Sequence, residues 1–138
     1  MLPDGSINPG QMTSFNHYAL GSVCDFLHKT VGGLRSSSPG WRTVEVSPRP
    51  GGTIRYAKTS FDSPYGPYSV GWKCEGSKML TTVTVPPNGE AHVVLSKVDT
   101  IVGSGEHTFE TEWAEDASWP PLPIQGAQGN EIPAYYFE

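Results

Sequence analysis

The sequence predicts a mainly β protein, a small antiparallel β-sandwich preceded by one long amphipathic α-helix. Apolar residues recur with the period of a helix over residues 14–32, and from Arg42 onward they alternate with polar residues. Clusters of Gly, Pro, Asn, Asp and Ser separate the alternating segments. Several short strands at close spacing with turn signals between them are typical of a sandwich.

Composition limits the classes of partner. Hydrophobic residues make up 36% of the 138-residue chain and charged residues 17%, while 16 Gly and 13 Pro favour a turn-rich β body over a helical bundle. The net charge of −5 argues against nucleic acid or an anionic membrane as a partner. No apolar run is long enough to span a bilayer. Residues 1–12 lack the basic and apolar regions of a signal peptide, which leaves the compartment unknown.

The helix over residues 14–32 has clear start and stop signals. Thr13 and Ser14 are natural N-caps, and Gly32-Gly33 terminates the periodic segment. Its apolar stripe comprises Phe15, Tyr18, Ala19, Val23, Phe26, Leu27 and Val31. No second amphipathic helix follows in the chain, and an isolated helix is marginal in water. We therefore expect the stripe to be buried against a partner.

After a linker over residues 35–40, the alternation predicts a series of strands. They cover residues 42–47, 53–60 with Ile54 and Tyr56 inward, 68–74, 79–85 and 91–95. Asn88-Gly89 predicts a hairpin between the last two of these, and residues 100–102 and 107–113 are expected to pair around Gly103-Ser104-Gly105. Residues 113–138 are acidic and rich in Pro and Gly, which favours a solvated tail over a Pro-rich ligand for an aromatic groove.

Few residues have the arrangement that chemistry requires. The carboxylates form no convincing acid–base pair, and His17, His28, His92 and His107 lack metal-ligand spacing, so neither a metal nor a cofactor is expected. Free thiols are favoured for Cys24 and Cys74, although pairing is possible. His17, beside Asn16 near the helix start, could donate to a sugar hydroxyl or satisfy loop carbonyls.

Several motifs resemble those of the α-L-rhamnosidases. The string Ser14-Phe15-Asn16-His17-Tyr18-Ala19-Leu20-Gly21, preceded by Asp4-Gly5 and Asn8-Pro9-Gly10, is similar to the last helix of their catalytic domain. The region that follows is similar to their C-terminal β-sandwich domain. Its matching pieces are Pro39-Gly40-Trp41-Arg42, Pro48-Arg49-Pro50-Gly51-Gly52, Asp62-Ser63-Pro64-Tyr65-Gly66, Gly71-Trp72-Lys73, Val83-Thr84-Val85-Pro86-Pro87-Asn88 and Val102-Gly103-Ser104-Gly105.

The resemblance implies the end of an inverting glycoside hydrolase with an (α/α)6 barrel. Residues 1–34 would be the last loop and helix of that barrel, residues 35–112 the sandwich domain and residues 113–138 a tail. The family's general acid lies far upstream, and its general base, a Glu in a W-E-R-W-like motif, would fall just before residue 1. No catalytic residue is therefore carried over. Only His17, with Asn16 as a possible second residue, is expected to contact rhamnose.

The leading hypothesis is a C-terminal fragment of an α-L-rhamnosidase that acts on terminal α-L-rhamnose and is inactive alone. The partners implied are a rhamnosyl glycan, if the rest of the barrel is supplied, and the missing catalytic-domain polypeptide. Two alternatives remain open. One is a carbohydrate-binding module with Trp41, Trp72 and Trp113 as stacking residues. The other is a subunit that completes a split barrel.

Overall fold

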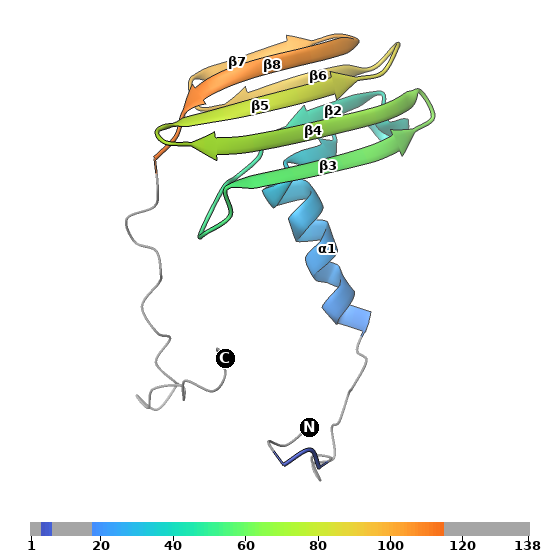
Figure 1. The fold of residues 1–138 in the computed structure, drawn as a ribbon. Helices are drawn as coiled ribbons and strands as arrows, with labels where there is room; N and C mark the ends of the chain where they lie inside the picture. The colour runs from blue at the N-terminus through green and yellow to red at the C-terminus, as the bar shows by residue number, and fades with distance from the viewer. Residues whose placement is uncertain (1–3, 7–17, 115–138) are drawn as a thin grey trace, which may run out of the picture.

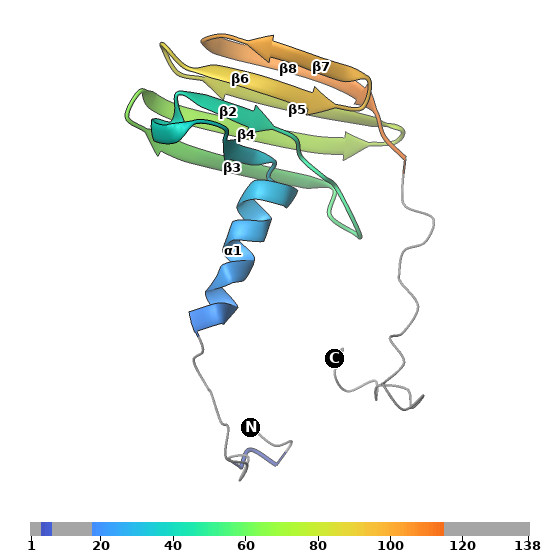
Figure 2. The same cartoon turned by 180° about the vertical axis from the view of Figure 1, so that it is seen from behind.

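The strands of this protein form two facing sheets. The computed structural model describes residues 4–6 and 18–114. One sheet has the order β1 (Leu34–Ser36), β2 (Thr43–Val46), β6 (Glu90–Leu95) and β7 (Val98–Val102). The other has the order β3 (Tyr56–Ser63), β4 (Gly66–Glu75), β5 (Lys78–Val85) and β8 (Gly105–Glu112). The second sheet faces the viewer in Figure 1 and the first sheet in Figure 2, which confirms the predicted β-sandwich.

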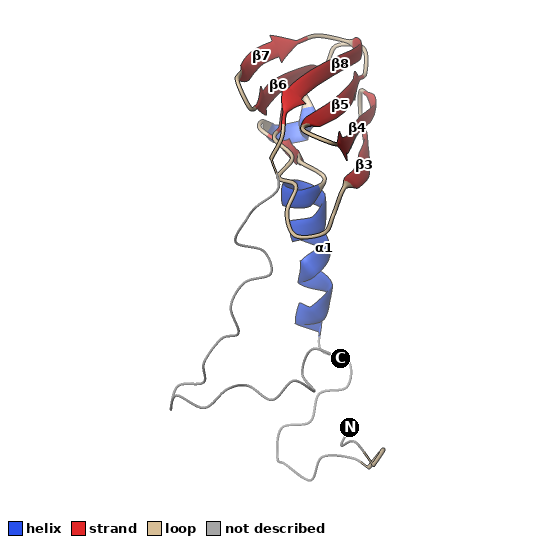
Figure 3. Ribbon diagram, turned by 60° about the vertical axis from the view of Figure 1, so that its left-hand side comes forward, coloured by secondary structure: helices blue, strands red, loops and turns tan. Residues whose placement is uncertain are grey.

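A helical segment, residues 18–31, precedes the sandwich and projects from it. It consists of a 3-10 turn, η1 (Tyr18–Ser22), the short helix α1 (Val23–Phe26) and a π-helical turn, η2 (Leu27–Val31). The segment ends at Gly32-Gly33, as the sequence predicts, while the expected start at residue 14 lies outside the described residues. Only its last turn touches the sheets, and the rest extends away from them (Figure 3).

The core lies between the inner faces of the two sheets. Alternate residues of β2, β4, β5 and β6 point inward because successive side chains of a strand face opposite sides. Nine residues form the main buried cluster: Leu34, Val44, Val46, Tyr68, Val70, Val83, Val85, Ala91 and Val93. A second cluster of Val31, Trp72, Cys74 and Met79 lies where the helical segment meets the sandwich.

Two predicted strand pairings are wrong, although the strands themselves exist. The turn at Asn88-Gly89 joins β5 to β6, but these strands belong to different sheets, and the same holds for β7 and β8. β6 instead pairs in parallel with β2 and antiparallel with β7, while β8 pairs with β5. The turn residues specify only that the chain reverses. The sheet that each strand joins depends on which inner face completes the core.

Gly89 is required by the packing of this crossover between sheets. A Cβ atom at Gly89 would lie 2.2 Å from the hydroxyl oxygen of Tyr68. That hydroxyl donates a hydrogen bond to the Arg42 carbonyl at 3.0 Å, and burial raises the pKa of Tyr68. The Asn-Gly pair therefore allows the backbone to pass close to a buried tyrosine on its way between the sheets.

The prediction that Ile54 and Tyr56 of residues 53–60 face the core is also wrong. Ile54 and Tyr56 are exposed, and β3 instead turns Ala57, Thr59 and Phe61 toward the core. These three residues lie opposite Trp72, Val70 and Tyr68 of β4, and directly opposed residues of an antiparallel pair share a face. Phe61 stacks on Trp41 with 3.7 Å between ring centroids, which gives it a better-packed position than Tyr56 could reach.

The first strand of the sandwich is not among the predicted strands. Residues 34–36 form β1, so part of the predicted linker is a strand that pairs with β2. Leu34 is fully buried in the main cluster. The strand is missed because its exposed serines resemble a linker and its single buried residue shows no alternation.

Thr81 offers a test of this core. Its hydroxyl is buried and has no hydrogen-bond partner among the described residues, a condition that costs free energy. We expect Thr81→Val, which keeps the shape of the side chain, to raise the free energy of unfolding by about 1 kcal/mol. Chemical denaturation measures this difference. Thr82→Val, one position away on the outer face, is the control and should change stability by less than about 0.5 kcal/mol. A destabilising Thr81→Val would contradict the description of the site.

Candidate functional site

The junction between the helical segment and the sandwich is the most distinctive site of the described chain. Trp72 of β4 donates its indole N–H to the carbonyl oxygen of Val31 at 2.7 Å, and both residues are buried. The amide of Arg49 donates to the carbonyl of Thr30 at 3.0 Å. Both bonds satisfy carbonyl groups at the end of the helical segment, which lack partners within a helix. The last turn is thereby attached to the sandwich.

Gly33 allows the chain to leave the helical segment directly against the β2–β3 loop. Its φ is +79°, and a Cβ atom there would lie 2.2 Å from the backbone nitrogen of Pro48. Its carbonyl accepts a hydrogen bond from the amide of Ser47 at 2.8 Å. A larger residue would separate the strand from the loop, so Gly33 has both a conformational and a packing role.

Seven exposed apolar side chains lie on the helical segment and beside this junction. We name this set the stalk surface, and it consists of Tyr18, Leu20, Val23, Phe26 and Leu27 of the helical segment together with Ile54 and Tyr56. Tyr18 is 91% exposed, Tyr56 74% and Phe26 55%. Two hollows of ≈410 Å³ and ≈450 Å³ adjoin it, and both are lined in part by Val31 and Ile54. An exposed apolar surface of this kind marks an interaction site.

The residues that the sequence singles out for sugar contact, His17 and Asn16, lie outside the described residues. His28, eleven residues further along the sequence, lies at the junction instead. Its Nε2 is 3.4 Å from the Ser60 carbonyl, and its ring meets Trp41 edge-on at 6.4 Å between centroids. Cys24 and Cys74 are both free, the first exposed and the second buried, and burial raises the pKa of the Cys74 thiol.

The expected aromatic stacking face does not form from the three tryptophans. Trp72 is buried in the core, as the alternation of β4 requires, and Trp41 is covered by Phe61. Trp113 carries the guanidinium of Arg55 over its ring at 5.0 Å. Aromatic rings that stack on sugars must present an open face. This route to carbohydrate binding is therefore not supported.

Several acidic residues of the described part form ion pairs on the surface of the β3-β4-β5-β8 sheet. Glu75 and Glu110 adjoin one hollow of ≈200 Å³, but Glu75 is paired with Lys73 and Glu110 with Lys78, each at 2.5 Å. The hydrogen bond and charge of Lys73 lower the pKa of Glu75. A general acid needs a raised pKa, so these carboxylates resemble a surface ion-pair network. No cluster of three possible metal ligands occurs among the described residues.

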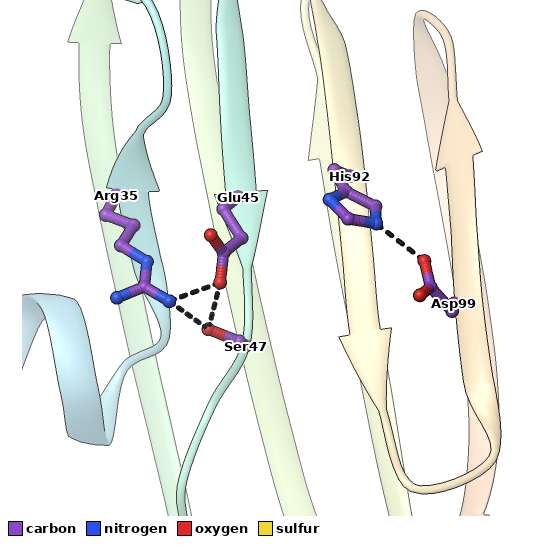
Figure 4. A network of polar contacts seen from close by, with 5 residues as sticks. All are labelled: Arg35, Glu45, Ser47, His92 and Asp99. Atoms are coloured by element: carbon purple, nitrogen blue, oxygen red, sulfur yellow. Dashed lines mark hydrogen bonds and ion pairs between the residues drawn. The ribbon is translucent and has the colours of Figure 1, made fainter.

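A second polar network covers the outer face of the other sheet (Figure 4). Arg35 pairs with Glu45, whose carboxylate also accepts a hydrogen bond from Ser47 at 2.9 Å. Nearby, His92 Nε2 lies 2.6 Å from Asp99. The hydrogen bond from Arg35 is the main cause that lowers the pKa of Glu45, and burial opposes it. These contacts join neighbouring strands of the sheet, β1 with β2 and β6 with β7.

Comparison with known proteins identifies the sandwich. Residues 33–110 match the sequence profile of the bacterial α-L-rhamnosidase C-terminal domain. The chain belongs to this family. The match begins at the Gly33 junction and ends within β8, so it covers the sandwich except for the last two residues of β8.

Individual relatives agree with the family match. An α-L-rhamnosidase from Streptomyces avermitilis is 40% identical over 91 residues, which is 66% of this chain and 9% of that enzyme. The crystal structure of native α-L-rhamnosidase from Aspergillus terreus superposes with a TM-score of 0.74 at 49% identity, over 80% of this chain and 13% of that one. The Streptomyces avermitilis enzyme crystallised with L-rhamnose gives a TM-score of 0.68 at 32% identity, over 79% of this chain and 12% of that one.

This α-L-rhamnosidase C-terminal domain therefore corresponds to about a tenth of the length of the curated relatives it matches. In the described residues no helix has the length and apolar character needed to cross a membrane.

The sequence analysis identified the family and the apolar helix but missed Ile54 and Tyr56 as members of the stalk surface. The local alternation could not reveal their exposure, because that depends on the pairing of β3 with β4.

Removal of the indole donor tests the junction. In Trp72→Phe the carbonyl of Val31 loses its partner inside the core, and we expect the free energy of unfolding to fall by about 1–3 kcal/mol. The helical signal in circular dichroism should be lost at lower denaturant concentration than the β signal. Trp113→Phe is the matched control, because that ring is only half-buried, and it should have the smaller effect. Equal effects of the two changes would contradict the anchoring role of Trp72.

The Arg35–Glu45 pair predicts a pH-dependent contribution to stability. Because the pKa of Glu45 is below its usual 4.5 in the folded protein, the pair stabilises the fold above that pH. The contribution is lost as the pH falls through the lowered value. We expect Glu45→Gln to cost about 0.5–1 kcal/mol at pH 7, since Arg35 is partly exposed to solvent, and nothing in strong acid. Denaturation at both pH values measures this. Glu90→Gln, which removes an exposed carboxylate of the same sheet, is the control and should change stability at pH 7 by less than about 0.5 kcal/mol.

Proposed function

We propose that this chain is the C-terminal part of an α-L-rhamnosidase that removes terminal α-L-rhamnose from glycosides or polysaccharides. In this proposal the sandwich is a structural accessory domain, and the chain alone has no hydrolytic activity. The catalytic acid and base belong to the remainder of the enzyme. The observation that carries the proposal is the exposed stalk surface on a chain whose match covers only 9–10% of the length of its α-L-rhamnosidase relatives.

The physical argument rests on the cost of leaving this surface in water. Burial of apolar area contributes roughly 25 cal/mol per Å², and the stalk surface contains five large side chains of a single helical segment. Because only the last turn is attached to the sandwich, the helical segment needs further contacts to be stable. Packing against the helices of a catalytic barrel would supply them. His17 and Asn16 are then the residues that we expect to contact rhamnose.

The state of the described carboxylates supports the proposal that the isolated chain is inactive. An inverting glycosidase needs two carboxyl groups about 6.5–9.5 Å apart across a substrate cleft. Glu75 and Glu110 share a hollow, but each is paired with a lysine of its own, and the pKa of Glu75 is lowered. Asp25, the acid on the helical segment, is paired with Lys29 at 2.6 Å.

Complementation tests the proposal. The chain is mixed or co-expressed with the Streptomyces avermitilis α-L-rhamnosidase from which the segment matching this chain has been removed, and hydrolysis of an aryl α-L-rhamnoside is measured. We expect no turnover from the chain alone and restored turnover from the pair. Phe26→Asp, which places a charge in the stalk surface, should reduce the restored activity at least tenfold, because burial of an unpaired carboxylate is costly.

Asp25→Asn is the matched control, since Asp25 is the neighbour of Phe26 and carries an exposed, ion-paired carboxylate. It should restore activity as well as the unchanged chain does. Turnover by the isolated chain would overturn the proposed accessory role. Equal complementation by the Phe26→Asp chain would show that the stalk surface is not the docking surface.

A further inference from the structure

The outer face of the β3-β4-β5-β8 sheet contains a hollow centred on a glycine. Gly71 lies in the middle of β4, and its cross-strand neighbours are Lys58 of β3 and Thr82 of β5. Its backbone does not have the positive φ that would demand glycine. A Cβ atom at this position would meet only the Lys58 side chain, at 4.0 Å. Neither conformation nor crowding therefore explains the glycine.

The absence of a side chain at Gly71 leaves a depression in the sheet. Glycine in a strand interior weakens the strand and often marks close approach of a ligand. The hollow has a volume of ≈370 Å³, a size suited to a sugar residue. The exposed side chain of Leu80 forms part of its wall, and this sheet faces the viewer in Figure 1, away from the other sheet.

The lining of the hollow is rich in hydroxyl groups that lie in register. Thr82 lies opposite Gly71, and Thr84 lies opposite Ser69. Each hydroxyl both donates and accepts hydrogen bonds, which matches the hydroxyl groups of a sugar. The carboxylate of Glu106, opposite Thr84 on β8, adds an acceptor at one side. Leu80 offers an apolar contact for the C–H groups of a sugar ring.

The charge of the hollow points to an acidic sugar. Lys58 and Lys73 both line it, although the whole chain has a net charge of −5. Lys73 is paired with Glu75 at 2.5 Å, whereas Lys58 forms no ion pair within the described part of the chain. An ammonium group beside a set of hydroxyls is suited to a ligand that combines a carboxylate with hydroxyls.

We propose that this hollow binds a uronic acid residue of a glycan, with the sugar carboxylate on Lys58 and its hydroxyls on Thr82 and Thr84. The site lies on the sandwich and uses none of the stalk surface. The choice of a glycan as ligand rests on the proposed function, while the choice of an acidic residue rests on the lysines. Such a site would hold the rhamnosidase on an acidic polysaccharide.

Titration of the full chain with trigalacturonate, followed by amide NMR shifts, tests the proposal. We expect saturable shifts at Lys58, Gly71 and Thr82. The neutral methyl ester of the same trisaccharide should bind about tenfold more weakly, as should the Lys58→Gln chain. Lys29→Gln is the matched control, because it removes the same charge from the helical segment, and its affinity should be unchanged.

Gly71→Val fills the hollow without strain and improves the strand propensity, so the chain should fold and lose binding. Chemical-shift changes that persist in the Gly71→Val chain would overturn the location of the site. Equal shift changes with polyglutamate would overturn its preference for a sugar. No binding of trigalacturonate by the unchanged chain would also overturn it. The outcome is separate from complementation, because trigalacturonate contains no rhamnose and the readout is binding alone.

Discussion

The hydrogen bond from the Trp72 indole to the Val31 carbonyl is the contact on which the junction depends. Trp72 is a core residue of β4, yet its polar edge reaches the end of the helical segment. A carbonyl at a helix end that is buried without a partner is costly, so this bond determines where the last turn lies. Gly33 then lets β1 start at once beside Pro48. Together they make the helical segment project from the sandwich with its apolar face uncovered.

That geometry explains why the domain presents two different surfaces. The stalk surface, which includes Ile54 and Tyr56, is apolar and exposed. This is the character of an interface with another folded unit. The outer face of the β3-β4-β5-β8 sheet is polar, carries ion pairs and is hollowed at Gly71. In the two proposals made above, the domain docks on the rest of the enzyme through the first surface and binds the glycan with the second.

Sequence patterns were sufficient for elements whose signals are local. The alternation of Tyr68, Val70, Trp72 and Cys74 predicted the buried face of β4, and Gly32-Gly33 predicted the end of the helical segment. The pairing of strands was not predicted. Asn88-Gly89 joins β5 to β6 in different sheets, and β6 pairs in parallel with β2. Pairing depends on contacts between residues far apart in the chain, which turn residues do not encode.

The sequence by itself determined the family, the sandwich class and the apolar stripe of the helix, because motifs and hydrophobic periods are local. Only the tertiary structure decided which apolar residues are left exposed. Tyr56 and Phe61 are both aromatic residues of β3. The register with β4 places Phe61 against Trp41 and leaves Tyr56 facing outward. Likewise, nothing in the sequence distinguishes Gly71 from other strand residues. Strand pairing is what places it between Lys58 and Thr82. A one-residue change of register would exchange both faces, and core packing selects the register observed.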